Sequence, residues 1–93
     1  MSTKAFSPAK EMSFTTVEND RQRLLAYCQQ LKEPVLILDL SAVTQCDSAG
    51  LAFLIEAKRL AREHKKICQI NGMTKTIHAL AEFCGVEGIL AVE

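Results

Sequence analysis

The chain has 93 residues, of which 48% are apolar and 24% are charged, and its eleven basic residues are balanced by eleven acidic ones. This composition excludes a disordered chain, and the length suffices for one small domain with a single modest core. The zero net charge argues against a general nucleic-acid binder, because neutralising phosphates requires a basic excess or a concentrated basic face.

The sequence carries no strong targeting or metal-binding pattern. No apolar run approaches the roughly 20 residues that cross a bilayer, and the start, MSTKAFSPAKEMS, contains no apolar stretch of signal-peptide length. We therefore expect a cytoplasmic protein. The four cysteines form no CxxC pair, so we expect reduced thiols, with Cys28 and Cys84 buried in helix packing. His64 and His78 have no carboxylate at ligand spacing, which argues against a metal site.

The first third of the chain predicts two short strands and a helix. The strand candidates are residues 5–6 and 12–14. The run Thr15-Thr-Val-Glu18 fits a capping box, with Thr15 as the N-cap and Glu18 three residues later. The helix that follows turns its apolar side chains inward: Leu24, Leu25, Cys28 and Leu31.

A run of branched apolar residues, 35–40, predicts a strand covered on both faces. Asp39 interrupts the run near its carboxyl end, where a polar group can reach the surface. After a polar loop from Ser41 to Cys46, the segment 47–64 has a strongly helix-forming composition and begins with two good capping residues. We expect one long helix there.

The last third predicts a strand at 67–70, a turn at 71–72 and a short helix over 74–83, with Gly85 at its end. One face of this helix is apolar and is expected to point inward: Ile77, Leu80, Ala81 and Cys84. Residues 88–92 predict either a last strand or a packed tail.

The alternation of strands and helices predicts an α/β fold, in which parallel strands are joined by right-handed helical crossovers. We expect a mixed sheet of about four strands with the helices largely against one face. Strand 35–40 should be central in this sheet and should lie next to strand 67–70.

The turn before the long helix reads Asp47-Ser48-Ala49-Gly50. It follows the carboxyl end of a strand, where ligands of α/β sheets usually bind, and the first amides of a helix favour negative charge. A hydroxyl at this place could accept a phosphoryl group. On local physics alone, an ordinary N-cap at Asp47 or Ser48, with Gly50 permitting close packing, is the better interpretation.

The segment VLILDLSAVTQCDSAGLAFLIEAKRLAREHKK, followed by ICQINGM and a short helix, resembles the STAS domain family of anti-sigma-factor antagonists and transporter regulators. The strand ending in D-L-S-x-V, the D-S-x-G-L helix start and the basic helix end carry this resemblance. It covers roughly residues 10–90 and implies one STAS-like domain over 1–93. It also implies that Ser48, after Asp47, is the phosphate acceptor if the protein is controlled by phosphorylation. We expect the family's first strand to be missing, because only about a dozen residues precede Thr15.

Within this family, three features resemble the STAS subunits of Mla-type phospholipid-transport ABC complexes: the run 12–17, the Gly-Leu-Ala continuation of the motif and the helix at 78–81. The resemblance implies a non-enzymatic module that docks on the ATPase subunit of such a complex, peripheral to the inner membrane, and supports its assembly and activity. The alternative is an anti-sigma-factor antagonist, in which a kinase-type partner phosphorylates Ser48 and thereby blocks binding.

The long helix has a broad apolar arc on a helical wheel. Beside this arc lies a stripe of small, apolar and basic residues: Ser48, Ala52, Ile55, Arg59 and Arg62. We expect the stripe, together with the motif residues Asp47, Ala49 and Gly50, to bind the partner protein. The alternative is an ordinary small-residue surface with solvated charges.

Enzymatic interpretations have little support in the sequence. Ser48, His78 and Asp39 can be written as a triad, but no G-x-S-x-G nucleophile elbow is present and the chain leaves little room for a substrate pocket. Without a Walker-A sequence, any nucleotide hydrolysis belongs to a partner. We expect no cofactor, no bound metal, no nucleic-acid partner and no direct insertion into the membrane.

Overall fold

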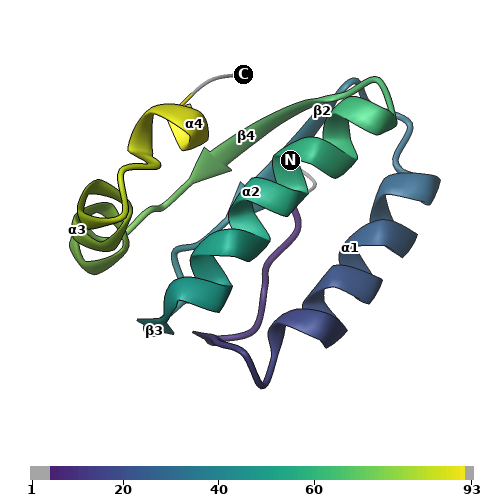
Figure 1. The fold of residues 1–93 in the computed structure, drawn as a ribbon. Helices are drawn as coiled ribbons and strands as arrows, with labels where there is room; N and C mark the ends of the chain where they lie inside the picture. Colours follow the sequence, from purple (N-terminus) through teal and green to yellow (C-terminus); the bar gives the residue numbers. More distant parts are fainter. Residues whose placement is uncertain (1–4, 92–93) are drawn as a thin grey trace.

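The computed structural model describes residues 5–91, which fold around one hydrophobic core (Figure 1). In chain order the elements are β1 (Glu11–Met12), α1 (Val17–Gln30), β2 (Val35–Asp39), β3 (Gln45–Cys46), α2 (Ser48–Glu63), β4 (Ile67–Asn71), α3 (Lys75–Phe83) and α4 (Glu87–Ala91).

Strands β2 and β4 form a parallel ladder, with Val35 opposite Ile67 at one end and Asp39 opposite Asn71 at the other. The prediction that strand 35–40 lies beside strand 67–70 is therefore confirmed. On the edge of β2 away from β4, the backbone of Phe6 forms an isolated parallel bridge. β2 thus has a neighbour on each side, as expected of a central strand.

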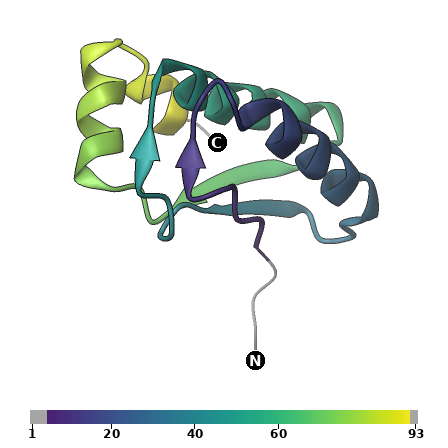
Figure 2. The ribbon, with the colours of Figure 1, turned by 90° about the horizontal axis from the view of Figure 1, so that it is seen from below.

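Strands β1 and β3 form a second parallel ladder, in which Met12 lies opposite Cys46 (Figure 2). The expected mixed sheet of about four strands is wrong in the described part of the chain, which has two parallel sheets of two strands each. The pairing is interrupted between Phe6 and β1 for two reasons. Pro8 has no backbone N–H, and the N–H of Ala9 is bonded to a side chain instead.

Helices α1 and α2 lie on the same side of β2 and β4, and no described helix covers the other side (Figure 2). Three leucines of the central segment point toward the helices and are completely buried: Leu36, Leu38 and Leu40. The alternate residues Val35 and Ile37 are only half-buried. The expectation of a strand covered on both faces is therefore wrong, whereas the placement of helices largely against one face is confirmed.

Helix α1 begins without the predicted capping box. Its N-cap is Thr16, not Thr15, and no side chain caps the helix. The Thr16 hydroxyl serves the preceding turn, because it donates to the carbonyl of Glu11 at 2.7 Å and accepts from the N–H of Ser13 at 2.9 Å. Of the predicted inward residues, Leu24 and Cys28 are buried, and Leu25 and Leu31 are half-buried.

The predicted bounds of the two later helices are confirmed. Asp47 is the N-cap and His64 the C-cap of α2, and Thr74 caps α3 by accepting from the N–H of Ile77 at 3.2 Å. Gly85 ends α3 with a φ of 73°, a conformation that favours glycine.

One expectation for the carboxyl-terminal part is wrong, and one of two alternatives is decided. Cys84 is exposed rather than buried, because it is the C-cap of α3, where the chain turns away from the apolar face. Of the two alternatives for residues 88–92, the strand is not formed: residues 87–91 are the helix α4, and Leu90 packs into the core, as the alternative of a packed tail implies. The last residue of the predicted strand, Val92, lies outside the described residues.

A buried carboxylate holds the amino-terminal segment against α1. Asp20 is fully buried, and both of its oxygens accept from the N–H of Ala9, the shorter bond being 3.1 Å. Arg23 pairs with Asp20 at 2.8 Å, donates to the carbonyl of Ser7 at 3.2 Å and lies 4.9 Å from the centre of the Phe6 ring. These contacts fix the segment that leads into β1.

We expect Asp20→Ala to lower the free energy of unfolding by about 1–3 kcal/mol, because it leaves the amide of Ala9 without its acceptor. Urea denaturation followed by circular dichroism measures this change. The matched control is Glu18→Ala on the same helix, at an exposed position where a change within about 0.5 kcal/mol is expected. Equal effects of the two substitutions would contradict the role of the buried carboxylate.

The four cysteines are free thiols that differ in exposure. Burial raises the pKa of Cys68 to about 11 and that of Cys46 to about 11, and it also raises the pKa of Cys28. A thiol with a raised pKa holds little reactive thiolate at neutral pH. We expect one thiol, Cys84, to react with Ellman's reagent in a fast phase in the native protein, and the other three to react fast only after denaturant unfolds the protein. Cys84→Ser should remove the fast phase, and a fast phase that survives this substitution would disprove the assignment.

Candidate functional site

The motif predicted from the sequence lies at the amino terminus of α2, where Asp47 joins three segments. One oxygen of its carboxylate accepts from the N–H of Gly50 at 3.0 Å, and the other accepts from the N–H of Phe14 at 3.2 Å. Its own N–H donates to the carbonyl of Met12 at 3.0 Å. The hydrogen bond from the Gly50 amide holds the pKa of Asp47 below its usual value, so the carboxylate is charged at neutral pH.

Gly50 is required by packing. A Cβ at this position would overlap the carbonyl oxygen of Met12 and come within 2.8 Å of the Met12 Cβ. The first turn of α2 can therefore lie directly on β1 only when residue 50 has no side chain. The sequence interpretation in which Gly50 permits close packing is the one that the geometry supports.

Ser48 is the first residue of α2 and is exposed. Because Asp47 is the N-cap, the hydroxyl of Ser48 is not needed to cap the helix. No hydrogen bond joins this hydroxyl to any residue between 5 and 91. The motif thus presents a solvent-facing hydroxyl beside a carboxylate that is fully engaged in holding the loop.

The predicted stripe along α2 lies on the surface. Ser48, Ala52, Arg59 and Arg62 are exposed, and Ile55 is half-buried against the core. Its two cations differ. Arg59 pairs with Glu56 at 2.6 Å and also with Glu63, so its charge is compensated within the helix. The hydrogen bond that Arg59 donates to the Glu56 carboxylate is the main cause of the raised pKa of Arg59. Arg62 has no ion pair with the described residues.

A hollow of about 330 Å³ lies beside the stripe, between α1 and α2. It is lined by Val17, Glu18, Arg21, Ala49, Ala52, Phe53 and Glu56. The small side chains of Ala49 and Ala52 leave the space open. The cations at its rim are already paired, since Arg21 binds Glu18 at 3.2 Å and Arg59 binds Glu56. Shape, more than unpaired charge, therefore distinguishes this surface.

Sequence reasoning missed two parts of this surface. Phe14, which we expected at the end of a short strand, follows β1 with its side chain 78% exposed, and its backbone is bonded to Asp47. The α1 side of the hollow, from Val17 to Arg21, was also not predicted. The place of Phe14 depends on the pairing of β1 with β3, which brings residues 11–14 to the motif, and the α1 side of the hollow depends on the packing of α1 against α2. The sequence gives no local signal for either contact.

The alternatives based on catalysis or metal binding gain no geometric support. Asp39 accepts from the N–H of Ser41 at 3.0 Å, and within residues 5–91 no hydrogen bond joins any two of Ser48, His78 and Asp39. No cluster of three His, Cys, Asp or Glu side chains in the described part of the chain could hold a metal ion. Among the described helices, none combines the length and apolarity needed to cross a membrane.

The sequence profile of the family described as "Mlab, STAS domain" matches residues 11–91, which is most of the chain. The protein therefore belongs to the STAS domain family, and its domain is of the MlaB type. No curated protein matches the chain.

We expect Gly50→Ala to lower the free energy of unfolding by about 1–3 kcal/mol, because the added methyl group must displace β1 or the first turn of α2. Thermal and urea unfolding measure this effect. Gly88→Ala is the matched control, since a Cβ at position 88 meets no atom within 4 Å and the same substitution there should be neutral or slightly stabilising. A neutral Gly50→Ala would show that the contact with Met12 does not constrain the helix.

Proposed function

We propose that this protein is a non-enzymatic binding module that acts as an accessory subunit of a phospholipid-transport ABC complex of the Mla type. It docks on the ATPase subunit through the amino-terminal half of α2 and thereby supports assembly and activity of the complex. In this role the protein is cytoplasmic and reaches the inner membrane only through its partner. STAS domains act in general as binding modules, and the MlaB-type match favours this complex over other partners.

The observation that carries the proposal is that an exposed aromatic side chain and an apolar hollow both lie close to Ser48. Phe14, whose backbone is bonded to Asp47 of the motif, presents a large, mostly exposed apolar side chain, and Ala49 of the same motif lines the hollow with Ala52. An exposed aromatic ring and an adjacent apolar depression are typical of the central contacts of protein interfaces.

Charge contributes at one end of this surface. Because Arg59 is already paired with two glutamates, Arg62 is the stripe cation that can pair with a carboxylate of the partner. An ion pair at the rim of an interface mainly increases the association rate and adds little affinity. We therefore assign the affinity to Phe14, Ala52 and Ile55, and the orientation of the partner to Arg62.

The alternative function, an anti-sigma-factor antagonist controlled by phosphorylation, is favoured by one observation. The hydroxyl of Ser48 is exposed at the amino terminus of a 16-residue helix, where the helix dipole stabilises an added phosphate. The charged carboxylate of Asp47 is its direct neighbour and opposes the modification. A phosphate here would also place a dianion on the docking surface, which would block a partner that fits a neutral hydroxyl.

The deciding experiment is a titration of the protein against the purified ATPase subunit of an Mla-type complex from the same organism. We expect Ala52→Arg and Ser48→Glu to fold normally and to weaken binding by at least about tenfold, because a charge buried without a partner at an interface costs several kcal/mol. Ser48→Ala should leave both folding and affinity nearly unchanged, since Asp47 and not Ser48 caps the helix.

Ala79→Arg is the matched control, because it places the same charge at an exposed position of α3, away from the stripe. Unchanged affinity for both charged α2 variants would remove this surface as the docking site. If instead the ATPase does not bind, and a kinase encoded with a sigma factor phosphorylates Ser48, the alternative function is correct.

A further inference from the structure

Phe14 is the large exposed apolar side chain beside the motif, and the fold does little to hold its ring. The side chain is 78% exposed, so few atoms of the chain pack against it. The position of the ring is therefore set by the backbone of the turn that carries it, residues 13–16, which we call the Phe14 turn.

One hydrogen bond joins the Phe14 turn to the start of α2. The other three N–H groups of the turn are bonded within the turn itself. The N–H of Phe14 instead donates to the Asp47 carboxylate at 3.2 Å. Within the described part of the chain, no other hydrogen bond connects this turn with residues 47–50.

A carboxylate is suited to this place because its two oxygens can accept from two different donors. One oxygen of Asp47 accepts from Gly50 at 3.0 Å and caps α2, and the other accepts from Phe14. Asparagine is an equally good N-cap, but it has a single carbonyl oxygen and would present its NH₂ group to the second donor. Serine also caps helices, but it has one oxygen on a shorter side chain.

We propose that Asp47 is a positioning residue, which acts on partner binding through Phe14 by holding the Phe14 turn in its docking orientation. This role rests on the docking surface proposed above. Asp47 itself is half-buried and both of its oxygens are engaged within the chain, so it is poorly placed to bind a partner directly. A ring that is already oriented spares the complex the entropy cost of ordering it.

Titration of Asp47→Asn against the ATPase subunit tests this role. The substitution keeps the shape of the side chain and the helix cap but removes one acceptor, so it should release the Phe14 turn. We expect the affinity to fall by about two- to tenfold, which is the cost of ordering one side chain on binding. Phe14→Ala should also weaken binding, and adding Asp47→Asn to Phe14→Ala should cause no further loss.

Hydrogen exchange followed by NMR gives a readout that a general loss of stability would not give. In Asp47→Asn, the amide of Phe14 should exchange about tenfold faster or more, whereas the amide of Gly50 should keep its protection. Asp47→Ser should give the same result, because serine caps the helix without reaching Phe14. Retained protection of the Phe14 amide in both variants, or equal loss of protection at Gly50, would overturn the proposal.

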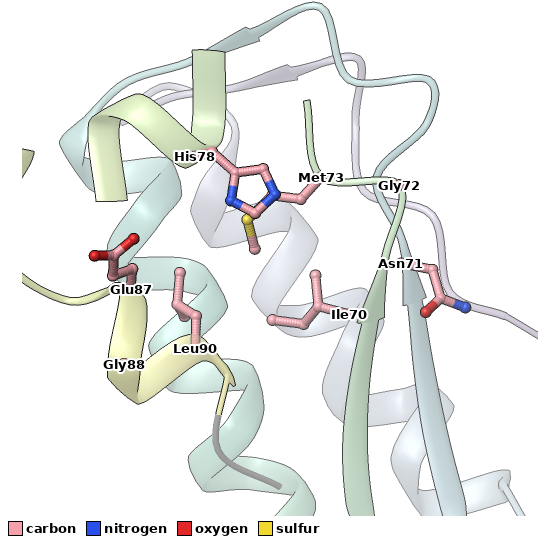
Figure 3. Close-up of a pocket in the computed structure, with 8 residues that line it drawn as sticks. All are labelled: Ile70, Asn71, Gly72, Met73, His78, Glu87, Gly88 and Leu90. Atoms are coloured by element: carbon pink, nitrogen blue, oxygen red, sulfur yellow. The ribbon is translucent and has the colours of Figure 1, made fainter. Parts of the chain in front are cut away.

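Thr74→Ala is the matched control, because it removes the side-chain cap of another helix, α3. Thr74 follows Met73, which lines a separate pocket of about 610 Å³ between β4, α3 and α4 (Figure 3). That pocket shares no residue with the hollow at α2. Thr74→Ala should destabilise the protein and still bind the ATPase subunit with unchanged affinity.

The titrations distinguish failure of this role from failure of the proposed function. If Phe14→Ala weakens binding and the two Asp47 variants do not, the docking surface stands and the positioning role is wrong. If the Asp47 variants weaken binding further in the Phe14→Ala background, Asp47 contacts the partner directly and the positioning role is again wrong. If Phe14→Ala and Ala52→Arg both bind like the wild type, the proposed function fails, and the positioning role fails with it.

Discussion

The close approach of α2 to β1 at Gly50 and Met12 is the constraint on which the rest of the structure depends. Met12 is completely buried and lies opposite Cys46 in the small second ladder, and its carbonyl accepts from the N–H of Asp47. The same contact places Phe14 within hydrogen-bonding distance of the Asp47 carboxylate. A side chain at position 50 would separate these elements. The D-S-x-G motif is therefore first a packing device, and the exposed position of Ser48 follows from it.

The fold compensates for its short strands with polar contacts at the amino-terminal segment. A strand of two residues contributes little to a sheet on its own, and the pairing between Phe6 and β1 is interrupted at Pro8. Asp20 accepts the amide hydrogen bond that a longer strand would have used, and Arg23 neutralises its charge. Since Arg23 is about half exposed, only one member of this ion pair bears the full cost of desolvation.

Elements with a strong local signal could be predicted from the sequence, and elements formed by distant pairing could not. The apolar run of β2, the Asp47 cap of α2 and the Gly85 end of α3 are local patterns, and the structure has each of them. β3 lay within a predicted polar loop, because its two residues become a strand only by pairing with β1. The stripe on α2 followed from helical periodicity, but Phe14 and the α1 side of the hollow required the tertiary arrangement.

The paired charges around the hollow bear on how this surface recognises a partner. Arg21 and Arg59 are each paired with a glutamate of their own helix. Both charges are therefore compensated within the chain, and neither arginine needs a carboxylate from the partner. Surface ion pairs of this kind contribute little to stability, but they keep cations from attracting unrelated acidic surfaces. If this surface docks the partner as proposed, discrimination rests on whether that partner fits Phe14 and the space over Ala52. Under this proposal a charge at Ser48 alters the fit, because Ser48 is exposed and directly precedes Ala49, which lines the hollow.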